Sequence, residues 1–163
     1  MILKQDGSLW STPIAFHGNI EEQRVTGKQF VQVIPHGVMS MAAGTGYSMV
    51  VKHDGSVWAS GRNYLGQLGD GSKVRKTSFV FVRTIPGAQA VATGGGHSLV
   101  LADKGVIWGT GWNKYGQLGE DGPSTCAKRF FVSFPADAKA MDAGRYRNFL
   151  YSLFVCLLVK QNE

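Results

Sequence analysis

The sequence has few of the features that mark secreted, metal-binding or membrane-spanning proteins. It contains two cysteines, Cys126 and Cys156, and neither belongs to a C-x-x-C pair. We therefore expect two reduced thiols, with no disulfide framework and no metal site. There is no N-x-S/T sequon and no signal peptide, which predicts an intracellular protein of the cytoplasm or the nucleus.

Long hydrophobic runs are also absent. The longest mostly apolar stretch covers residues 149–159 (FLYSLFVCLLV), whereas a helix that crosses a bilayer needs about 20 apolar residues. We predict no membrane span. Amphipathic stretches of helical period are not visible either, which disfavours helical repeat folds.

Charged side chains are sparse, at 17% of the residues, and the net charge is +6. The 17 lysines and arginines are scattered, without a run of five like charges and without a long basic tail. Nucleic acid is therefore disfavoured as a partner.

Glycine, in contrast, is abundant and recurs at a fixed phase. Residues 41–72 and 91–122 match without a gap at an offset of 50 residues, and residues 4–10 (KQDGSLW) echo residues 52–58 (KHDGSVW). A fixed period near 50 residues indicates an array of supersecondary units. The recurring glycines and tryptophans are Gly44, Gly55, Trp58, Gly61, Gly66 and Gly69 in one copy and Gly94, Gly105, Trp108, Gly111, Gly116 and Gly119 in the next.

These recurring residues are interpreted as structural. The glycines are predicted to occupy turns rather than a phosphate-binding loop, because neither glycine-rich run leads into a helical pattern. The tryptophans, which follow the turns at a constant phase, are predicted to pack between neighbouring units; an exposed recognition stripe is the alternative.

Each unit carries strand signals. Residues 47–51 and 57–60 are β-rich runs on either side of an Asp-Gly turn, which we expect to be of the primed type, and further runs lie at 79–84 and 88–93. Four short strands per ~50 residues are typical of a β-propeller blade. We predict an all-β fold, a partial β-propeller of about three four-stranded repeats.

The segment G-x-N-x-x-G-Q-L-G at residues 61–69 and 111–119, preceded by D-G-x-(V/L)-W, resembles the repeat of the regulator of chromosome condensation 1 (RCC1) family. On this resemblance, residues 1–151 form an RCC1-like array. Its parts are a degenerate first repeat at 1–38, full repeats at 39–88 and 89–138, and the start of a broken repeat at 139–151. Residues 152–163 are predicted to be an apolar tail outside the repeat.

The RCC1 family resemblance implies a closed ring of seven blades, which about three repeats cannot form. Either the chain is a fragment of a longer protein, which we favour, or copies associate through open blade edges. A truncated product without a function of its own is a third possibility.

No catalytic constellation emerges from the sequence. The histidines are His17, His36, His53 and His97. His97 is replaced by Tyr47 one period earlier and by Arg147 one period later, which a metal or catalytic role built on the repeat would not tolerate. We predict no enzyme activity, no catalytic residue, no metal and no cofactor.

Basic residues after the two G-Q-L-G runs are the candidate contact site: Lys73, Arg75, Lys76, Lys128 and Arg129. In a propeller these loops would share one face, which Arg24 and Lys28 would join. Acidic residues on the same loops, Glu21, Glu22, Asp70, Glu120 and Asp121, leave that face with a net charge of only about +2. Ordinary solvated loops are therefore the alternative to a partner-binding role.

The sequence thus favours a non-enzymatic protein–protein interaction module of RCC1-type blades, with a small GTPase or a ubiquitin-pathway component as possible kinds of partner. The alternative function, implied by the resemblance, is guanine-nucleotide exchange on a Ran-like GTPase together with chromatin association. Exchange requires a protruding wedge, which would appear as an insertion, and the two clear repeats contain none.

Overall fold

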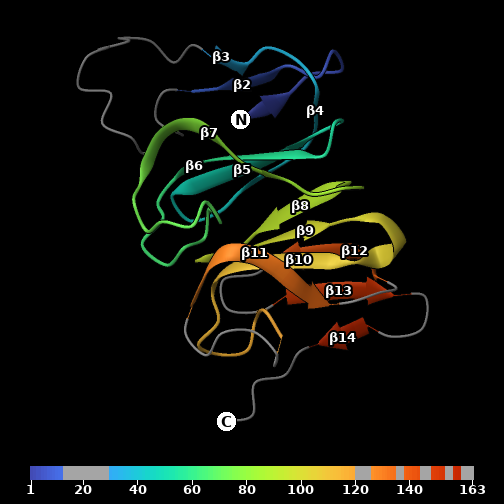
Figure 1. The fold of residues 1–163 in the computed structure, drawn as a ribbon. Helices are drawn as coiled ribbons and strands as arrows, with labels where there is room; N and C mark the ends of the chain where they lie inside the picture. Colours follow the sequence, from blue (N-terminus) through green and yellow to red (C-terminus); the bar gives the residue numbers. More distant parts are fainter. Residues whose placement is uncertain (13–29, 120–125, 135–137, 144–147, 153–155, 159–163) are drawn as a thin grey trace.

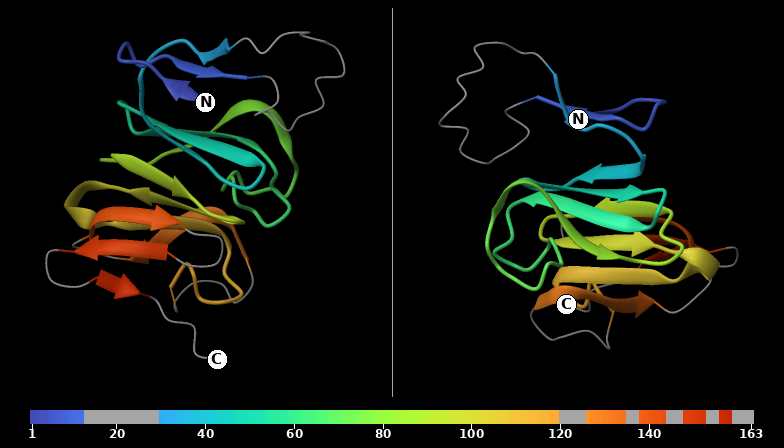
Figure 2. Two further views of the ribbon diagram at one scale, coloured as in Figure 1. Left: turned by 180° about the vertical axis from the view of Figure 1, so that it is seen from behind. Right: turned by 45° about the horizontal axis from the view of Figure 1, so that its top comes forward.

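The protein folds into four antiparallel β-sheets that follow one another in sequence and lie side by side as an open array (Figure 1). The computed structural model describes residues 1–12, 30–119, 126–134, 138–143, 148–152 and 156–158. The predicted all-β, partial propeller of four-stranded blades is confirmed. The first and last sheets lie at opposite ends of the array, and the described residues do not close a ring (Figure 2).

The two middle sheets have four strands each, in sequence order. The second sheet contains β4 (Val38–Ala43), β5 (Tyr47–Lys52), β6 (Ser56–Gly61) and β7 (Lys76–Thr84). The third sheet contains β8 (Ala90–Thr93), β9 (His97–Leu101), β10 (Ile107–Trp112) and β11 (Cys126–Phe134). β5, β6, β7 and β8 overlap the four runs predicted from the sequence, although β7 begins three residues earlier than predicted and β8 two residues later.

The outer sheets have three described strands each. The first contains β1 (Ile2–Leu3), β2 (Leu9–Ser11) and β3 (Val31–Ile34); the fourth contains β12 (Ala138–Ala143), β13 (Asn148–Ser152) and β14 (Cys156–Leu158). β14 corrects one expectation. Residues 152–163 were expected to lie outside the repeat, yet Phe149 pairs with Leu158 and Tyr151 with Cys156. The missing Asp-Gly signal misled the prediction, because strand pairing does not require that turn.

The hairpin turn of the repeat also differs from the expected type. The Gly55 amide donates to the Lys52 carbonyl at 2.9 Å, and of residues 53–55 only Gly55 has a positive φ, +77°. A primed two-residue turn needs a positive φ at its central residues, so this is a three-residue loop closed by a left-handed glycine. Asp54 completes the turn by accepting a hydrogen bond from the Ser56 amide at 2.8 Å.

An irregularity in the pairing of the third and fourth strands lies beside another pair of recurring glycines. Between Ala59 and Gly61 the partner in β7 changes from Val80 to Lys76, and the same shift occurs opposite Gly109 and Gly111 in the next sheet, so the extra residues lie in the fourth strand. Gly61 has a φ of +105°, and a Cβ added there would lie 2.5 Å from the Gly46 carbonyl oxygen. Only glycine fits this crowded, left-handed end of β6, which is why the position recurs.

Three hydrophobic clusters fill the spaces between successive sheets. Trp58 packs on the cluster of Leu9, Ile34 and Val50, which joins the first and second sheets. Trp108 packs on the cluster that joins the second and third sheets. The predicted packing of these two tryptophans between blades is therefore confirmed. Because both faces of a middle sheet are covered, β5 and β9 are buried almost throughout.

Candidate functional site

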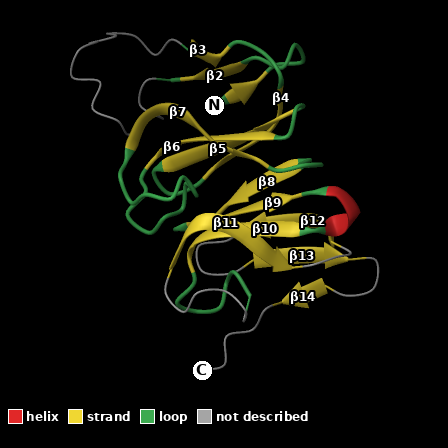
Figure 3. Ribbon diagram, in the orientation of Figure 1, coloured by secondary structure: helices red, strands yellow, loops and turns green. Residues whose placement is uncertain are grey.

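The long loops that follow β6 and β10 project from the same end of the array, which we call the loop face (Figure 1). They comprise residues 62–75 and the described residues 113–119, and the β4–β5 and β8–β9 turns lie at the same end. The β5–β6 turn and the short 3-10 helix η2 (Asp103–Gly105) lie at the opposite end (Figure 3). The repeat therefore builds two chemically distinct ends.

The loop after β6 is organised around two buried amide side chains. The Asn63 side-chain oxygen accepts from the Leu68 amide at 3.0 Å, and the Gln67 side-chain oxygen accepts from the Leu65 amide at 3.0 Å. Asn63 Nδ2 donates toward Asp70 Oδ1 at 2.9 Å and toward the Val74 carbonyl at 3.3 Å. Asn63 thus holds together both ends of a loop that has no regular secondary structure.

The loop after β10 repeats this arrangement. The Asn113 side-chain oxygen accepts from the Leu118 amide at 2.6 Å, and the Gln117 side-chain oxygen accepts from the Tyr115 amide at 2.9 Å. In both loops the amide of the motif's third glycine donates to the carbonyl of its second, at 3.0 Å from Gly69 to Gly66 and at 2.9 Å from Gly119 to Gly116. The G-x-N-x-x-G-Q-L-G motif therefore encodes the loop's own structure: its second and third glycines occupy turns, whereas its first lies at the end of a strand.

The first loop is also fastened to the next sheet. Thr110 Oγ1 lies 3.0 Å from the Gly66 carbonyl oxygen, and Ser98 Oγ lies 2.8 Å from the Gln67 carbonyl oxygen. Further along, the Gly71 amide donates to the Lys128 carbonyl at 2.7 Å. Loop 62–75 consequently bridges two blades, and its shape depends on both.

Asp70 is the centre of the loop's electrostatics. Its carboxylate lies 3.1 Å from Lys76 Nζ and accepts from the Ser72 amide at 2.9 Å. Burial acts to raise the pKa of Asp70, but the hydrogen bonds from Ser72, Lys76 and Asn63 outweigh it and hold the pKa below its usual value. The Asp70 carboxylate is therefore ionised at neutral pH, and its hydrogen bonds and its ion pair are made within the loop and to Lys76.

The structure brings the two groups of predicted basic residues together. The bond from Gly71 to Lys128 and an isolated bridge between Asp70 and Arg129 place β11 beside the first loop. The five predicted residues differ in exposure. Lys73, Lys128 and Arg129 are exposed, whereas Arg75 and Lys76 are partly buried, and Lys76 is engaged by Asp70. The other charged residues considered with them, Glu21, Glu22, Arg24, Lys28, Glu120 and Asp121, lie outside the described residues.

Sequence reasoning missed the apolar side chains of the loop face. Tyr64 and Val74 are 63% and 64% exposed, and Tyr115 is 43% exposed. Tyr115 packs edge-on against Trp112, with ring centroids 5.1 Å apart. These residues occupy the variable x positions around the G-x-N-x-x-G-Q-L-G motif, so a search for recurring residues passed over them.

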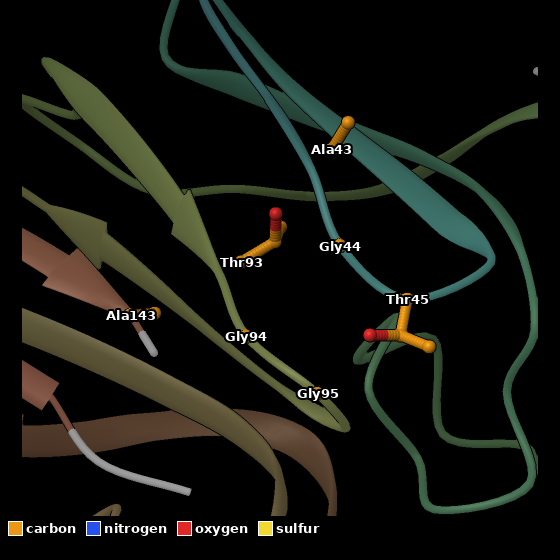
Figure 4. Close-up of a pocket in the computed structure, with 7 residues that line it drawn as sticks. All are labelled: Ala43, Gly44, Thr45, Thr93, Gly94, Gly95 and Ala143. Atoms are coloured by element: carbon orange, nitrogen blue, oxygen red, sulfur yellow. The ribbon is translucent and has the colours of Figure 1, made fainter. Parts of the chain in front are cut away.

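A pocket of about 440 Å³ opens between the turns at this end (Figure 4). It lies where β4, β8 and β12 end, and Ala43, Thr45, Thr93 and Ala143 line it together with three glycines. Among the described residues that line the pocket, the polar side chains are the hydroxyls of Thr45 and Thr93.

Catalytic and metal-binding candidates do not converge in the part of the chain that the structure describes. There, no group of three or more His, Cys, Asp or Glu side chains is placed to hold a metal ion. His97 is buried, whereas His36 and His53 are exposed, and His17 lies outside the described residues. Ser98 is buried between the Tyr47 hydroxyl and the Gln67 carbonyl. Among the described residues, no helix has the length and apolar character that a membrane crossing requires.

Several solved structures share this fold. Human WBSCR16 aligns with a TM-score of 0.78 at 19% identity, over 92% of this chain and 41% of that one. A chain from the structure of Kap60 bound to yeast RCC1 (Prp20) aligns with a TM-score of 0.69 at 19% identity, over 90% and 36%. Prp20p from Saccharomyces cerevisiae gives 0.65 at 18% identity, over 88% and 39%. The chain thus spans about two fifths of the length of these structures.

Sequence comparison points to the same family. No curated protein matches the chain. Two family models do match, both described as the regulator of chromosome condensation (RCC1) repeat, one over residues 54–101 and the other over residues 88–117. These segments contain Trp58 and Trp108, the first asparagine-centred loop and most of the second. The repeat matches identify residues 54–117 as RCC1 repeats, and the propeller fold of the described residues agrees with that assignment.

Proposed function

We propose that this chain is a non-enzymatic protein–protein interaction module that binds its partner through the loop face. The observation that carries the proposal is that recurring and non-recurring residues of the repeat have different roles. The recurring polar residues, such as Asn63, Gln67 and Ser98, form hydrogen bonds inside and between blades. The non-recurring residues around them, such as Tyr64 and Val74, are exposed on the same loops.

The loop face has the composition of a binding surface. Tyrosine, tryptophan and arginine are enriched at the energetic centres of protein interfaces. A loop held by internal hydrogen bonds loses little conformational entropy on binding, so its contacts are converted into affinity more efficiently. A reducing compartment, either the cytoplasm or the nucleus, accords with the free thiol of Cys126.

A protein partner also has a precedent among chains of this fold. The structure of Prp20p is described together with that protein's binding to Gsp1p and histones. The likeness to Prp20p concerns the fold, so the identity of a partner for this chain has to be measured.

The test is proximity labelling in cells with three forms of the chain. The loop-face variant carries Tyr64→Ser and Val74→Ser, and the control variant carries His53→Ser and Lys104→Ser, two exposed residues at the opposite end. We expect proteins that are enriched by the wild type and the control but lost with the loop-face variant, and that bind the purified wild-type chain directly. Identical enrichment by all three forms would contradict the loop-face assignment.

The absence of enzyme activity is part of the proposal and has its own assay. Nucleotide release from a purified Ran-like GTPase is measured with and without the chain. We expect the intrinsic rate to be unchanged. Acceleration by substoichiometric amounts of the chain would replace the interaction-module proposal with guanine-nucleotide exchange.

A further inference from the structure

We propose that the loop face recognises an acidic segment of a protein partner that carries apolar side chains among its carboxylates. This inference rests on the proposed function and specifies the chemistry of the partner. The binding surface, which we call the seam patch, runs across the junction between the second and third sheets. Its apolar centre consists of Tyr64, Leu65, Val74, Trp112 and Tyr115.

The apolar centre is continuous across two blades. A Cβ placed on Gly96 would lie 2.6 Å from Leu65 Cδ1 and 3.6 Å from Trp112 Cβ, so Leu65 and Trp112 both lie beside Gly96. Trp112 then contacts Tyr115 edge-on at an interplanar angle of 73°. On the other side, the hydrogen bond from Asn63 to the Val74 carbonyl brings Val74 next to the segment that carries Tyr64.

The rim of the seam patch is cationic. Arg62, Lys73, Lys114, Lys128 and Arg129 are all exposed. The guanidinium of Arg129 packs on the loop, since a Cβ on Gly71 would lie 2.8 Å from its Nη2. Cations around an apolar centre favour a partner that places carboxylates around apolar anchors.

The positive charge of the rim is not cancelled by the described loops. Within residues 62–76, 112–119 and 126–130 the sequence contains one acidic residue, Asp70. Its carboxylate is occupied by Lys76, Ser72 and Asn63. The exposed rim cations therefore act on an approaching partner without a competing carboxylate from these segments.

The same surface is less suited to single-stranded nucleic acid. Binding of unpaired bases depends on aromatic rings whose faces are open for stacking. Here the Trp112 and Tyr115 rings are packed edge to face, and Lys114 Nζ lies 5.7 Å from the centre of the Tyr115 ring. The aliphatic side chains of Leu65 and Val74 offer contacts to a peptide and no stacking surface to a base.

The test is fluorescence anisotropy with the whole chain and a labelled decapeptide, DEDFDELEDE. A second peptide, DEDSDESEDE, keeps the charge and removes the anchors, and oligothymidine of the same length reports on nucleic acid. We expect saturable binding of the first peptide and at least about fivefold weaker binding of the second, as the loss of a small interface anchor predicts.

Matched variants locate the binding site. The double variant Lys73→Glu, Arg129→Glu and the single variant Tyr64→Ser are each expected to raise the Kd of the first peptide by about tenfold or more. A change of this size is typical of residues at the centre of an interface. Lys104→Glu makes one such charge reversal at the opposite end and is expected to alter the Kd by less than about twofold. All substituted side chains are exposed, and a thermal melt of each variant verifies that it is folded.

Three results would overturn the acidic-segment proposal. The first is that DEDFDELEDE shows no saturable binding up to about 1 mM. The second is that the wild type and both seam-patch variants bind it with the same Kd. The third is that oligothymidine binds more tightly than the peptide and that this binding is lost in the same variants. The last result would identify a nucleic-acid site instead. Peptide binding can fail while the loop-face variant still loses its partners in cells, which would reject the acidic segment and leave the interaction module standing.

Discussion

The hydroxyl groups of Tyr47 and Ser98 lie 3.1 Å apart, although the two residues belong to successive sheets. The Tyr47 hydroxyl also donates to the His97 carbonyl, and Ser98 Oγ lies against the Gln67 carbonyl of the first long loop. Burial raises the pKa of Tyr47, so its phenol stays protonated and remains a donor. One buried polar network thus joins two blades and the loop between them.

Removing this hydroxyl is expected to destabilise the array. Tyr47→Phe keeps the ring and removes the hydroxyl that donates to the buried His97 carbonyl. That carbonyl then loses one of its hydrogen bonds and keeps the one from the Gly94 amide. We expect the free energy of unfolding to fall by about 1–2 kcal/mol, as for a buried hydrogen bond. Urea unfolding measures the change, and Tyr64→Phe, on the exposed tyrosine, serves as the control with no expected change. An unaltered urea midpoint for Tyr47→Phe would show that the network adds no stability.

Two glycines at the same phase of the repeat are predicted to differ in their tolerance of alanine. Gly66 and Gly116 have similar φ angles, +77° and +69°. A Cβ on Gly66 would lie 2.6 Å from the Ala127 carbonyl oxygen of the next sheet, whereas none of the described atoms lies within 4 Å of a Cβ on Gly116. We expect Gly116→Ala to cost about 1 kcal/mol, from backbone strain alone, and Gly66→Ala to cost at least about 3 kcal/mol. Equal costs in chemical denaturation would contradict the clash with the neighbouring blade.

The organising role of Asn63 predicts a local and a global effect. Asn63→Ala removes the acceptor of the Leu68 amide and the donor to Asp70 and Val74. We expect a loss of about 2 kcal/mol, together with faster hydrogen exchange of the Leu68 amide, because a buried amide loses its partner. The exchange of the Val50 amide, in the core of β5, is the internal reference. Unchanged protection of Leu68 would exclude Asn63 as the residue that holds the loop.

Asp70 predicts a dependence of stability on acid. Because its pKa is lowered in the folded chain, its contribution is fully present above the ordinary value of 3.8 and is lost as the pH falls through the lower, folded value. Thermal midpoints measured from about pH 6 to about pH 2.5 should therefore fall more steeply for the wild type than for Asp70→Asn. Asp6 and Asp54 also have lowered pKa values and contribute to both curves, so the difference between the curves isolates Asp70. Parallel curves would contradict the prediction.

Trp58 is predicted to matter through packing between blades. It is partly buried, its Nε1 donates to Ser56 Oγ at 3.0 Å, and its ring contacts Phe81 edge-on. We expect Trp58→Ala to lower the free energy of unfolding by about 2–3 kcal/mol, less than the range for a fully buried tryptophan, and Trp58→Phe by about 1 kcal/mol. A thermal midpoint that does not respond to Trp58→Ala would argue for a surface role of the ring.

The fold was predictable because the repeat gives every structural position twice. Gly61 and Gly111, or Asn63 and Asn113, recur at one offset because the same left-handed strand end and the same loop are built in each blade. A requirement of backbone geometry thus appears in the sequence as a residue that recurs at the same position of each repeat. The pairing of Cys156–Leu158 left no trace of this kind, since a strand at the end of a sheet needs only an extended backbone in register.

The candidate site was only partly predictable, for the opposite physical reason. Lys73, Lys128 and Arg129 were found because charge stands out in a weakly charged chain. Tyr64 and Tyr115 were not, because exposed aromatic residues that do not recur cannot be distinguished from core residues by composition. The ion pair between Lys76 and Asp70 could not be predicted either, since a sequence does not show which charges face each other.

The bond between Gly71 and Lys128 has a consequence for how the protein is made. The loop residue leaves the ribosome 57 positions before the strand residue that fixes it. At synthesis rates of about 5–20 residues per second, the delay amounts to about 3–11 seconds. During that interval the nascent chain has the loop's sequence without its final shape. Each blade therefore fixes the loop of the blade before it, and that loop takes its final shape only after the next repeat has been synthesised.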